Sequence, residues 1–461
     1  MSFKINIMGF SRTTDVAATD MSEQNWNDVL TCEEALARLN IKAATLYSYV
    51  SRGLVRATPH EDGRKRLYLR RDIERLAARK RGRPPTGAVA ELTLRLGDPV
   101  LHTAITQVTP HGPRYRNRLA VDLAGSGAAF ESVAHLLSTG IWQSGLATWS
   151  PLDTPSDVLR FLSVYEGGVA SGDIGALLGM VPFALAMQGR GTREIADGGA
   201  VQAARLMMQS MAGCVGFLGP ERIFCPRAEG ESIAGQILRA AGAAVTPEGL
   251  RALNVALVVL ADNELAPATF SARVAASTNA DVFSCVAAAI GSHIGFSTGT
   301  GTEKVETLLL CEPLSALDAR VERVREYGAS LFGFNHPLYP GGDPRADLML
   351  QAAAQIAGQS NATPAAREGT RLTVAFLERM RRELDAHPGV ALGLVTLARA
   401  LGLPDGSATA IWIVSRTAGW VAHVMEQRTQ AFLLRPRAKY ETTASSETAR
   451  FADETAGAAR L

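Results

Sequence analysis

Three arginines and one histidine in the second half of the chain could bind a small carboxylic acid. His336 and Arg345 belong to the glycine- and proline-rich stretch SLFGFNHPLYPGGDPRA, Arg416 belongs to SRTAGWVAHVMEQ, and Arg435 belongs to LLRPRAKY. A planar guanidinium binds a carboxylate through two parallel hydrogen bonds, and a buried arginine needs an anionic partner. Together these residues predict a site for a di- or tricarboxylate, although no single one of them identifies it.

The segments that hold these residues are predicted to be helices. From about residue 91 to residue 440, apolar residues recur at spacings of three and four, as in FESVAHLLSTGIW and VTLARALGL. The chain has 461 residues, which is enough for two or three domains and a large core. The fold class expected is therefore mainly α.

Three strings stand in an order and at spacings that together resemble the citrate synthase family: LADNELAPATFSARVAASTNAD, SLFGFNHPLYPGGDPRA, and SRTAGWVAHVMEQ followed by LLRPRAKY. The resemblance covers residues 91–440. It implies an almost wholly helical body, in which a large domain (91–310 plus 411–440) and a small domain (311–410) close over oxaloacetate and acetyl-CoA. It also implies a homodimer with acyltransferase activity. A coenzyme A thioester would be the co-substrate, with no permanently bound cofactor and no metal.

The resemblance also implies a role for each candidate residue. Arg345, Arg416 and Arg435 match three arginines that clamp oxaloacetate, and the last of these reaches in from the partner chain. His336 matches the histidine that protonates the oxaloacetate carbonyl. The segment that contacts coenzyme A is matched by Phe332, Gly333, Phe334 and Asn335.

At three positions the sequence departs from the family pattern. Asn263 replaces a histidine that binds the oxaloacetate carbonyl, Thr298 stands where a histidine hydrogen-bonds the thioester oxygen, and Ala391 replaces the aspartate that removes the α-proton of acetyl-CoA. A positioned base contributes roughly 10²–10⁴ in rate and one oxyanion donor roughly 10²–10³. Asparagine and threonine still donate hydrogen bonds, whereas alanine accepts no proton. These replacements are therefore expected to impair removal of the α-proton more than binding of the ligand.

Two functions are therefore expected. The first is a regulator or pseudoenzyme that senses a carboxylate, an acyl-CoA or both without turnover. The alternative is an active acyltransferase of the tricarboxylic acid cycle type, forming citrate or 2-methylcitrate with a relocated base, or one that hydrolyses a preformed citryl-CoA-like thioester. His387, four residues before Ala391, is the nearest candidate base, although an exposed loop residue before Pro388 is its simplest interpretation.

Residues 31–80 form a separate charged unit, between a polar tail (1–30) and a linker (81–90). Thr31 and Glu34 predict a capping box, a second short helix starts near Ala43, and Asp62-Gly63 predicts a hairpin. Two short helices followed by a hairpin resemble the winged helix-turn-helix of the MerR and excisionase type. A solvated basic face on a protein-interaction module is the alternative.

The winged helix-turn-helix resemblance implies that this unit binds DNA. Between Arg64 and Arg83 there are ten basic residues and two acidic ones, a local concentration that a net charge of +2 conceals. The second helix would read the major groove and the hairpin would hold phosphates. The residues expected to contact DNA are Thr45, Tyr47, Ser48, Arg52, Arg64, Lys65 and Arg66.

Composition argues against several other classes of protein. Five cysteines without a CxxC pair indicate neither a zinc site nor a disulfide framework, so a reducing cytoplasm is expected. The longest apolar run, from Ile174, is too short to span a bilayer and contains Pro182, so no membrane association is expected. The stretch GFSTGTGTEKV lacks the GxxxxGK pattern of a phosphate-binding loop. The polar end, residues 441–461, is expected to be a tail.

Overall fold

The computed structural model of the chain consists of two compact units, which are described separately. One unit comprises residues 1–101 with 438–461, and the other comprises residues 102–437. The residues described are 29–39, 41–51, 55, 57–59, 66–70, 73–74, 101–144, 148–295, 301–309, 319, 321–322, 333–430 and 432–436. The predicted linker 81–90 and tail 441–461 lie outside them, and the division of the body into a large and a small domain stays a prediction.

The smaller unit contains two helices and a three-stranded antiparallel sheet. Its elements are β1 (Val29–Leu30), α1 (Cys32–Leu39), α2 (Ala43–Ser51), β2 (Ala57–Pro59) and β3 (Arg66–Leu69), with sheet order β1-β3-β2. Val29 and Leu30 belong to this sheet rather than to the predicted tail, because Leu30 packs into the core of the unit. The predicted capping box is present: Thr31 N–H donates to Glu34 Oε2 at 2.8 Å, and Glu34 N–H donates to Thr31 Oγ1 at 3.3 Å.

The larger unit is mainly helical, as predicted, but it begins with a small sheet that the helical periodicity did not indicate. Its strands are β4 (Thr106–Thr109), β5 (Gly112–Tyr115) and β6 (Arg118–Leu119), paired antiparallel in that order. The turn between β5 and β6 places Arg116 and Asn117 at positive φ. This sheet brings Tyr115 into the core of the body, where it is fully buried.

The remaining regular elements described for this unit are helices. Their bounds are α5 (Ala120–Gly125), α6 (Phe130–Thr139), α7 (Ser156–Leu162), α8 (Ile174–Ala186), α9 (Arg190–Asp197), α10 (Ala200–Cys214), α11 (Ile233–Ala240), α12 (Pro247–Leu260), α13 (Pro267–Ser277), α14 (Val282–His293), α15 (Gly301–Leu309), α17 (Pro344–Ala357), α18 (Pro364–Leu384), α19 (Val390–Ala400) and α20 (Ser407–Gln430). Short 3-10 turns are η1 (Ser163–Tyr165), η2 (Ser171–Asp173) and η3 (Val215–Phe217).

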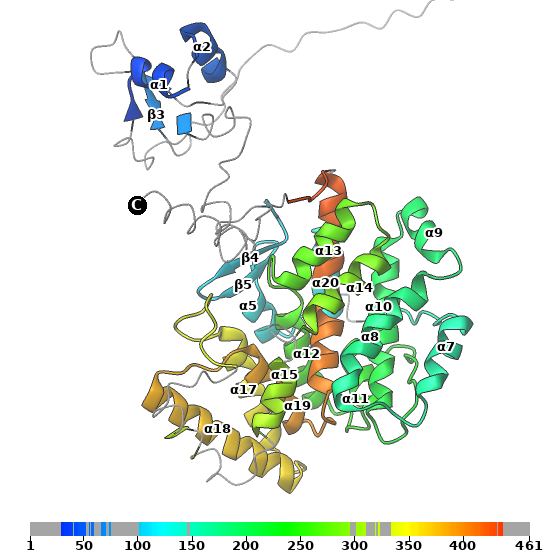
Figure 1. Ribbon diagram of the computed structural model, residues 1–461. Coiled ribbons are helices and arrows are strands. Elements are labelled where there is room, and N and C mark those ends of the chain that lie inside the picture. Colours follow the sequence, from blue (N-terminus) through cyan, green and yellow to red (C-terminus); the bar gives the residue numbers. More distant parts are fainter. Residues whose placement is uncertain are drawn as a thin grey trace, which may run out of the picture. The chain divides into compact units, whose positions relative to one another are not determined.

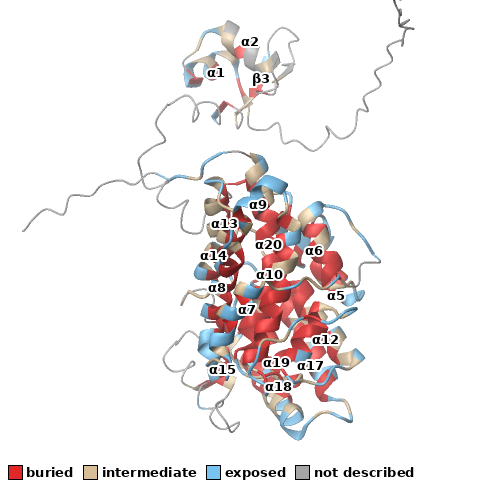
Figure 2. Cartoon of the chain, turned by 90° about the vertical axis from the view of Figure 1, so that its right-hand side faces the viewer, coloured by how far each residue is buried: buried red, intermediate tan, exposed pale blue. Residues whose placement is uncertain are grey.

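Helix α20 is the central element of this unit. It contacts α6, α8, α10, α12, α13 and α14, and all of these except α6 are labelled around it in Figure 1. Almost every residue from Ser407 to Val424 is buried, and α20 is coloured as buried along most of its length in Figure 2. A helix that is apolar on all sides belongs in a core. Any polar side chain on α20 is therefore held in one position by its neighbours.

Helices α17 and α18 pack against α19 and form a second group, seen in Figure 1. Close approach of α19 to α17 depends on Gly393, because a Cβ there would lie 2.9 Å from the Cα and carbonyl oxygen of Ala346. Helix α17 begins at the cap Asp343, whose side chain accepts from Arg345 N–H. This packing holds the first turn of α17, which carries Arg345, in place.

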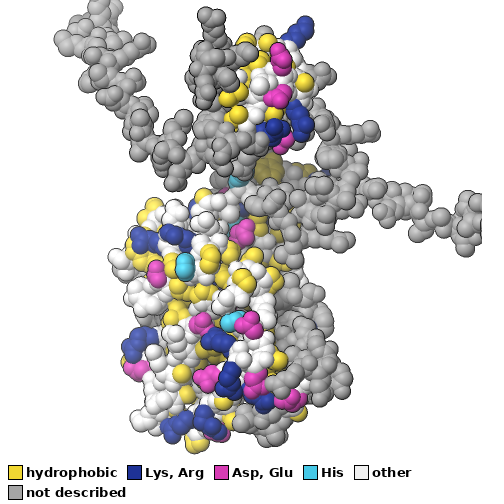
Figure 3. All heavy atoms as spheres, turned by 90° about the vertical axis from the view of Figure 1, so that its left-hand side faces the viewer, with side chains coloured by type: hydrophobic (Ala, Val, Ile, Leu, Met, Phe, Trp, Pro, Cys, Tyr) yellow, Lys and Arg dark blue, Asp and Glu magenta, His cyan; other side chains and the backbone are white. Residues whose placement is uncertain are grey.

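The surface of this unit mixes charges. On the face shown in Figure 3, Lys and Arg side chains are interspersed with Asp and Glu side chains. No single described helix is long and apolar enough to cross a bilayer, and one bent pair, Ser171–Ala186 with Arg190–Asp197, meets the length and composition criteria together.

Candidate functional site

Arg345 is fully buried and already paired with a carboxylate of its own chain. Its Nε donates to Asp343 Oδ1 at 3.0 Å and its Nη2 to Asp343 Oδ2 at 2.8 Å, while Nη1 donates to Asn263 Oδ1 at 2.9 Å. Burial lowers the pKa of Arg345, but Asp343 more than offsets it and raises the pKa. The anionic partner expected of a buried arginine is thus supplied to Arg345 by the helix cap Asp343.

Arg416 differs from Arg345 in lacking such a partner. Its side chain is buried, and Nε donates to the carbonyl oxygen of Leu260 at 2.7 Å, but it forms no ion pair with any residue that the structure describes. Burial lowers the pKa of Arg416, and Asp262 partly offsets this. A desolvated guanidinium without a close carboxylate favours an added anion. Arg416 is thus the strongest candidate to hold a carboxylate ligand.

Asp262, just after the end of α12, connects this site to the core. It is fully buried, and its Oδ2 accepts a hydrogen bond from His423 Nε2 at 3.2 Å. Its main-chain N–H and carbonyl both bond the hydroxyl of Tyr115 at 3.2 Å. Burial raises the pKa of Asp262, but His423 and Arg416 outweigh burial, so the pKa lies below its usual value. Asp262 is therefore an ionised group that partly offsets the burial of Arg416, although the two form no ion pair.

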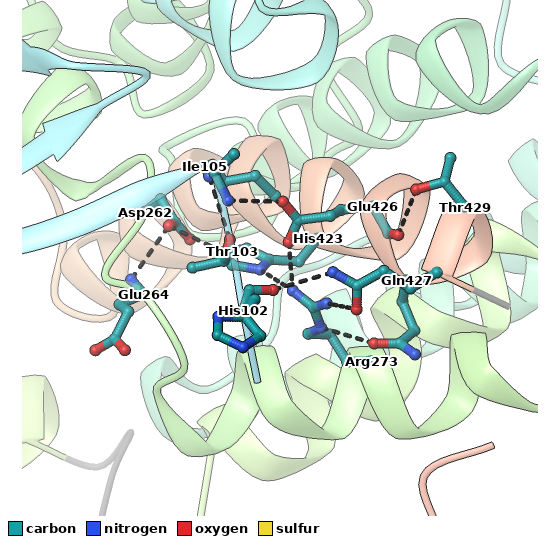
Figure 4. Close-up of polar contacts among 12 residues, drawn as sticks. His102, Thr103, Ile105, Asp262, Glu264, Arg273, His423, Glu426, Gln427 and Thr429 are labelled. Carbon is teal, nitrogen blue, oxygen red and sulfur yellow. Dashed lines mark hydrogen bonds and ion pairs between the residues drawn. The ribbon is translucent and has the colours of Figure 1, made fainter. Parts of the chain in front are cut away.

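Arg273 supports Asp262 from the opposite side of His423. Figure 4 shows its guanidinium surrounded by side chains of α20. Nη1 lies 3.1 Å from His423 Nδ1 and donates to Glu426 Oε2 at 2.6 Å, Nε donates to Gln427 at 2.9 Å, and Nη2 donates to Gln430 at 2.9 Å. Arginine has no acceptor, so His423 Nδ1 accepts and Nε2 carries the proton. The imidazole is neutral and donates to Asp262.

His336 stands on the loop that leads into α17. Its Nδ1 accepts from Leu338 N–H at 3.2 Å, and its ring lies 5.4 Å from the ring of Tyr339, which is itself 5.0 Å from the Arg345 guanidinium. Burial, followed by the charge of Arg345, lowers the pKa of His336. The imidazole is therefore neutral near pH 7, with its proton on Nε2, which leaves that N–H as a donor beside the arginine cluster.

The loop before His336 is paired with the segment that precedes α19. Asn335 N–H donates to the carbonyl of His387 at 2.8 Å, Gly389 N–H donates to the carbonyl of Gly333 at 2.6 Å, and Phe334 bridges to Pro388. Gly333 adopts φ +92°, and a Cβ there would also lie 3.1–3.3 Å from Val305 and Leu392, so glycine is required. Position 391 thus lies three residues after Pro388, which forms a strand-like bridge to the predicted coenzyme A loop.

Ala391 itself lies in the first turn of α19 and is 7% exposed, so it is a core residue. His387 is only 20% exposed at its side chain, which corrects the expectation of an exposed loop histidine. Its Nε2 lies 3.2 Å from Asp385 Oδ1, and its Nδ1 is buried without a hydrogen-bond partner among the described residues. That Nδ1 lies 3.5 Å from where a Cβ of Gly342 would stand, beside the cap of α17.

Aromatic side chains line the other side of Arg416. Trp412, Arg416 and Trp420 are spaced by four residues along α20 and so share one helix face. The imidazole of His293, the last residue of α14, lies 5.2 Å from the Trp412 ring and 5.8 Å from the Trp420 ring. Burial and the charge of Arg416 lower the pKa of His293 to about 3, so its imidazole stays neutral.

The structure brings together Asn263, His336, Arg345 and Arg416, but not every predicted residue. Arg435 is exposed at the end of the described chain. Thr298 and Phe332 lie outside the described residues, as do Arg52, Arg64 and Lys65 of the smaller unit; the side chain of Ser48 is also outside them. In that unit Tyr47 is 52% exposed, Arg66 is exposed and Thr45 is half-buried.

Five residues of the site were not predicted: Tyr115, Asp262, Arg273, Asp343 and His423. Asp343 has a sequence signal, since an aspartate before proline is a typical helix cap. Asp262 follows a long apolar helix, and a charged residue there must be paired. Tyr115 has no signal, because the strand that carries it meets α12 only in the folded chain. Among the described residues no group of three His, Cys, Asp or Glu side chains could hold a metal ion.

Comparisons with known proteins show similarity over most of the chain. Residues 96–437 match the family model described as "Citrate synthase, C-terminal domain". A "Putative citrate synthase 2" of Mycobacterium bovis is 28% identical over 71% of this chain and 86% of its own length. "Citrate synthase 2" of Bacillus subtilis and "2-methylcitrate synthase 2" of Corynebacterium glutamicum are each 30% identical, over 42% and 45% of this chain. These last two matches span about half the length of the relatives, 52% and 53%.

Solved structures share the fold. A citrate synthase from Thermoplasma acidophilum, in a ternary complex with carboxymethyl coenzyme A and oxaloacetate, superposes with a TM-score of 0.65 at 21% identity, covering 75% of this chain and 95% of the other. The Thermotoga maritima enzyme gives a TM-score of 0.61 at 20% identity, over 76% and 95%.

Proposed function

Because the chain belongs to the citrate synthase family, we propose that residues 96–437 bind an oxaloacetate-like 2-oxo dicarboxylate and transfer an acyl group to it from a coenzyme A thioester, forming citrate or 2-methylcitrate. The observation that carries the proposal is Arg416, a buried guanidinium that forms no ion pair with any described residue. It lies beside Arg345, which its own chain neutralises. One carboxylate of the substrate would form the ion pair that Arg416 lacks.

The neutral donors of the site suit a 2-oxo group. The amide oxygen of Asn263 accepts a hydrogen bond from Arg345 Nη1, so the NH₂ group of Asn263 stays available to donate. His336 carries its available proton on Nε2, as argued from the bond that its Nδ1 accepts. Two donors directed at a carbonyl oxygen stabilise the alkoxide that forms when a carbon nucleophile attacks. His336 would then give its Nε2 proton to that oxygen.

The nucleophile is the enol or enolate of the acyl-CoA, and its formation requires a group that accepts the α-proton. Ala391 provides none. His387 is the histidine that we propose for this step, because its buried Nδ1 makes no hydrogen bond with a described group while Asp385 holds its Nε2. Histidine oriented by a carboxylate is a common general base. After condensation, water hydrolyses the thioester and releases the free thiol.

The partner chain completes the proposed site. Arg435 is exposed in the single chain, as expected of a residue that acts in a neighbouring site. Helix α8 exposes Met180 at 37% and Phe183 at 56%, and Met187 just after it at 60%. We propose that a second copy covers this apolar face, giving a homodimer.

A second candidate function is a ligand-responsive regulator. The absence of a proton acceptor at Ala391 favours binding without turnover. The smaller unit favours a DNA partner, because α1 and α2 are joined by three residues and followed by the antiparallel pair β2 and β3. Closure of the body on a carboxylate or acyl-CoA would then change the spacing of two such units on DNA.

One set of measurements separates the two functions. Thiol release is followed with oxaloacetate and either acetyl-CoA or propionyl-CoA, for the wild type, His387→Ala and the control His111→Ala, an exposed histidine at the β4–β5 turn. Turnover that His387→Ala abolishes and His111→Ala preserves supports the acyltransferase. Calorimetric binding of oxaloacetate without thiol release, together with DNA binding that oxaloacetate alters, supports the regulator. A chain that neither binds oxaloacetate nor releases thiol contradicts both.

A further inference from the structure

A cavity of about 330 Å³ lies outside the arginine cluster described above. Its walls come from the segment 151–154, from α7, from α10 and from the segment 224–227, and it shares no lining residue with the cluster around Arg345 and Arg416. Pro151, Leu152, Leu159, Phe224 and Pro226 make most of the surface apolar. The volume is at the small end of the range for ligand pockets.

Arg227, a lining residue of this cavity, carries a buried donor that has no partner among the described groups. Arg227 is 1% exposed at its side chain, and its Nε and Nη2 both donate to the carbonyl oxygen of Glu231. Its Nη1 is buried and makes no hydrogen bond with any described group. A buried charged donor left unbonded is costly, so such an atom indicates a missing partner.

The surrounding carboxylates compensate Arg227 only weakly. Glu131 is the nearest, with Oε1 3.9 Å from Arg227 Nη2, and that oxygen already accepts from Ile233 N–H at 2.8 Å. Burial raises the pKa of Glu131, which disfavours its charged form. Glu231 is engaged by Arg239 through two hydrogen bonds of 2.7 and 2.8 Å.

A second guanidinium adds to the positive charge. Arg205 lies 5.4 Å and Arg227 lies 6.0 Å from the ring centroid of Trp149. Arg205 forms no ion pair with a described carboxylate, and burial lowers its pKa. Two guanidiniums that share one indole make the local potential positive, which favours an anion.

The other polar side chains of the cavity are occupied or repel a second charge. Gln209 accepts from Leu152 N–H at 2.8 Å and donates to the carbonyl of Ser150 at 3.2 Å. The Thr154 hydroxyl lies 3.2 Å from that of Ser210. Asp153 is exposed at the cavity and would repel an added carboxylate. The cavity therefore suits a ligand with one negative group and an apolar body.

We propose that this cavity binds a small monocarboxylate with an apolar body, whose carboxylate bonds Arg227 Nη1 and whose hydrocarbon part packs against Phe224, Leu159 and Pro226. It is a second ligand site, independent of the proposed acyl-transfer site. Its ligand class differs as well, because the Arg416 site takes a dicarboxylate whereas Asp153 disfavours one here.

Calorimetric titration of the full chain with benzoate tests the proposal. We expect saturable binding of one benzoate per chain. Benzamide, the neutral molecule of the same shape, should bind at least about tenfold more weakly because it cannot form a charged hydrogen bond. Arg227→Gln should weaken benzoate by a similar factor. Arg193→Gln, at an exposed arginine of α9 that lines a neighbouring cavity, should leave it unchanged.

Two further variants guard against misfolding and against binding at the other site. Leu159 is 40% exposed, so Leu159→Trp should fold and fill the cavity, which abolishes benzoate binding. Arg416→Gln should retain benzoate binding. Absence of saturable binding up to about 10 mM benzoate in the wild type would overturn the proposal. So would binding that Leu159→Trp leaves intact, or binding that Arg416→Gln removes.

Discussion

Arg273 Nη1 lies 3.1 Å from His423 Nδ1, deep in the core, and this contact determines which nitrogen of the imidazole holds the proton. Arginine only donates, so His423 must accept there and donate through Nε2 to Asp262. Asp262 in turn partly offsets the burial of Arg416, the residue proposed to bind a carboxylate of the substrate. Arg273 is thus linked, through His423 and Asp262, to the residue that we propose binds the substrate.

Replacing Arg273 should therefore impair substrate binding from a distance. Arg273→Lys keeps the charge but loses the planar fork that bonds Glu426, Gln427 and Gln430, so His423 is no longer held in one tautomer. We expect the dissociation constant for oxaloacetate to rise about tenfold, measured by calorimetry. The control is Arg371→Lys, at an exposed ion pair with Glu368, which should leave it unchanged. An unaltered constant in folded Arg273→Lys would show that this network serves stability alone.

Removal of the Arg416 charge should have a larger effect. Arg416→Gln removes the guanidinium that we propose pairs with a carboxylate of oxaloacetate. We expect oxaloacetate affinity to fall at least about 100-fold. Asp262 would then be a buried carboxylate with less compensation, so the melting temperature should also fall. Adding Asp262→Asn should recover the melting temperature but not the affinity. This result would distinguish the role of Arg416 in ligand binding from its role in compensating the charge of Asp262.

Glu306 should make stability depend on pH. Both oxygens of this buried carboxylate accept from Gly406 N–H, just before α20, at 3.2 Å, and burial raises the pKa of Glu306 to about 7, with Asp405 adding to the rise. The unfolded chain releases this proton near pH 4.5, so between these values the folded state binds more protons. The contribution of Glu306 to the free energy of unfolding is therefore fully present below pH 4.5 and is lost as the pH rises through about 7.

Glu306→Gln removes that dependence while keeping an acceptor for Gly406. We expect the melting temperature of the wild type to fall by roughly 2–5 °C more than that of Glu306→Gln between pH 5 and pH 8. Differential scanning fluorimetry at several pH values measures the difference. Parallel curves for the two proteins would contradict the assignment.

Gly419 should not tolerate a side chain. A Cβ at this position of α20 would lie 2.7 Å from the Cβ of Asp262 and collide with the Ala261 carbonyl, which accepts from Gly419 N–H at 3.1 Å. We expect Gly419→Ala to lower the free energy of unfolding by about 2–4 kcal/mol. The matched control is Gly291→Ala in α14, where nothing lies within 4 Å of a Cβ, and a helical alanine should stabilise by about 0.5–1 kcal/mol. Urea unfolding of both variants provides the test.

Much of the architecture follows from local sequence. The spacing of apolar residues predicts the helices of the body, and Thr31 with Glu34 predicts the start of α1, because both signals act within one or two turns of chain. The motifs around Arg345 and Arg416 likewise predict a substrate cluster, which stays a prediction, since their order along the chain is a property of the sequence itself. The strands β4 to β6 are not indicated, because they are short and their pairing depends on neighbours.

Only the tertiary structure decides which charges are already balanced. By sequence alone Arg345 and Arg416 are equivalent, but in the folded chain Asp343 forms an ion pair with the first, whereas the second forms none with a described residue. His387 is a loop histidine by sequence, yet packing against Gly342 buries its Nδ1. The sequence determines which groups the chain carries and which helices hold them. Their protonation and pairing depend on distances of about 3 Å between residues far apart in the sequence, such as Asp262 and His423, which are 161 positions apart, and those distances exist only after folding.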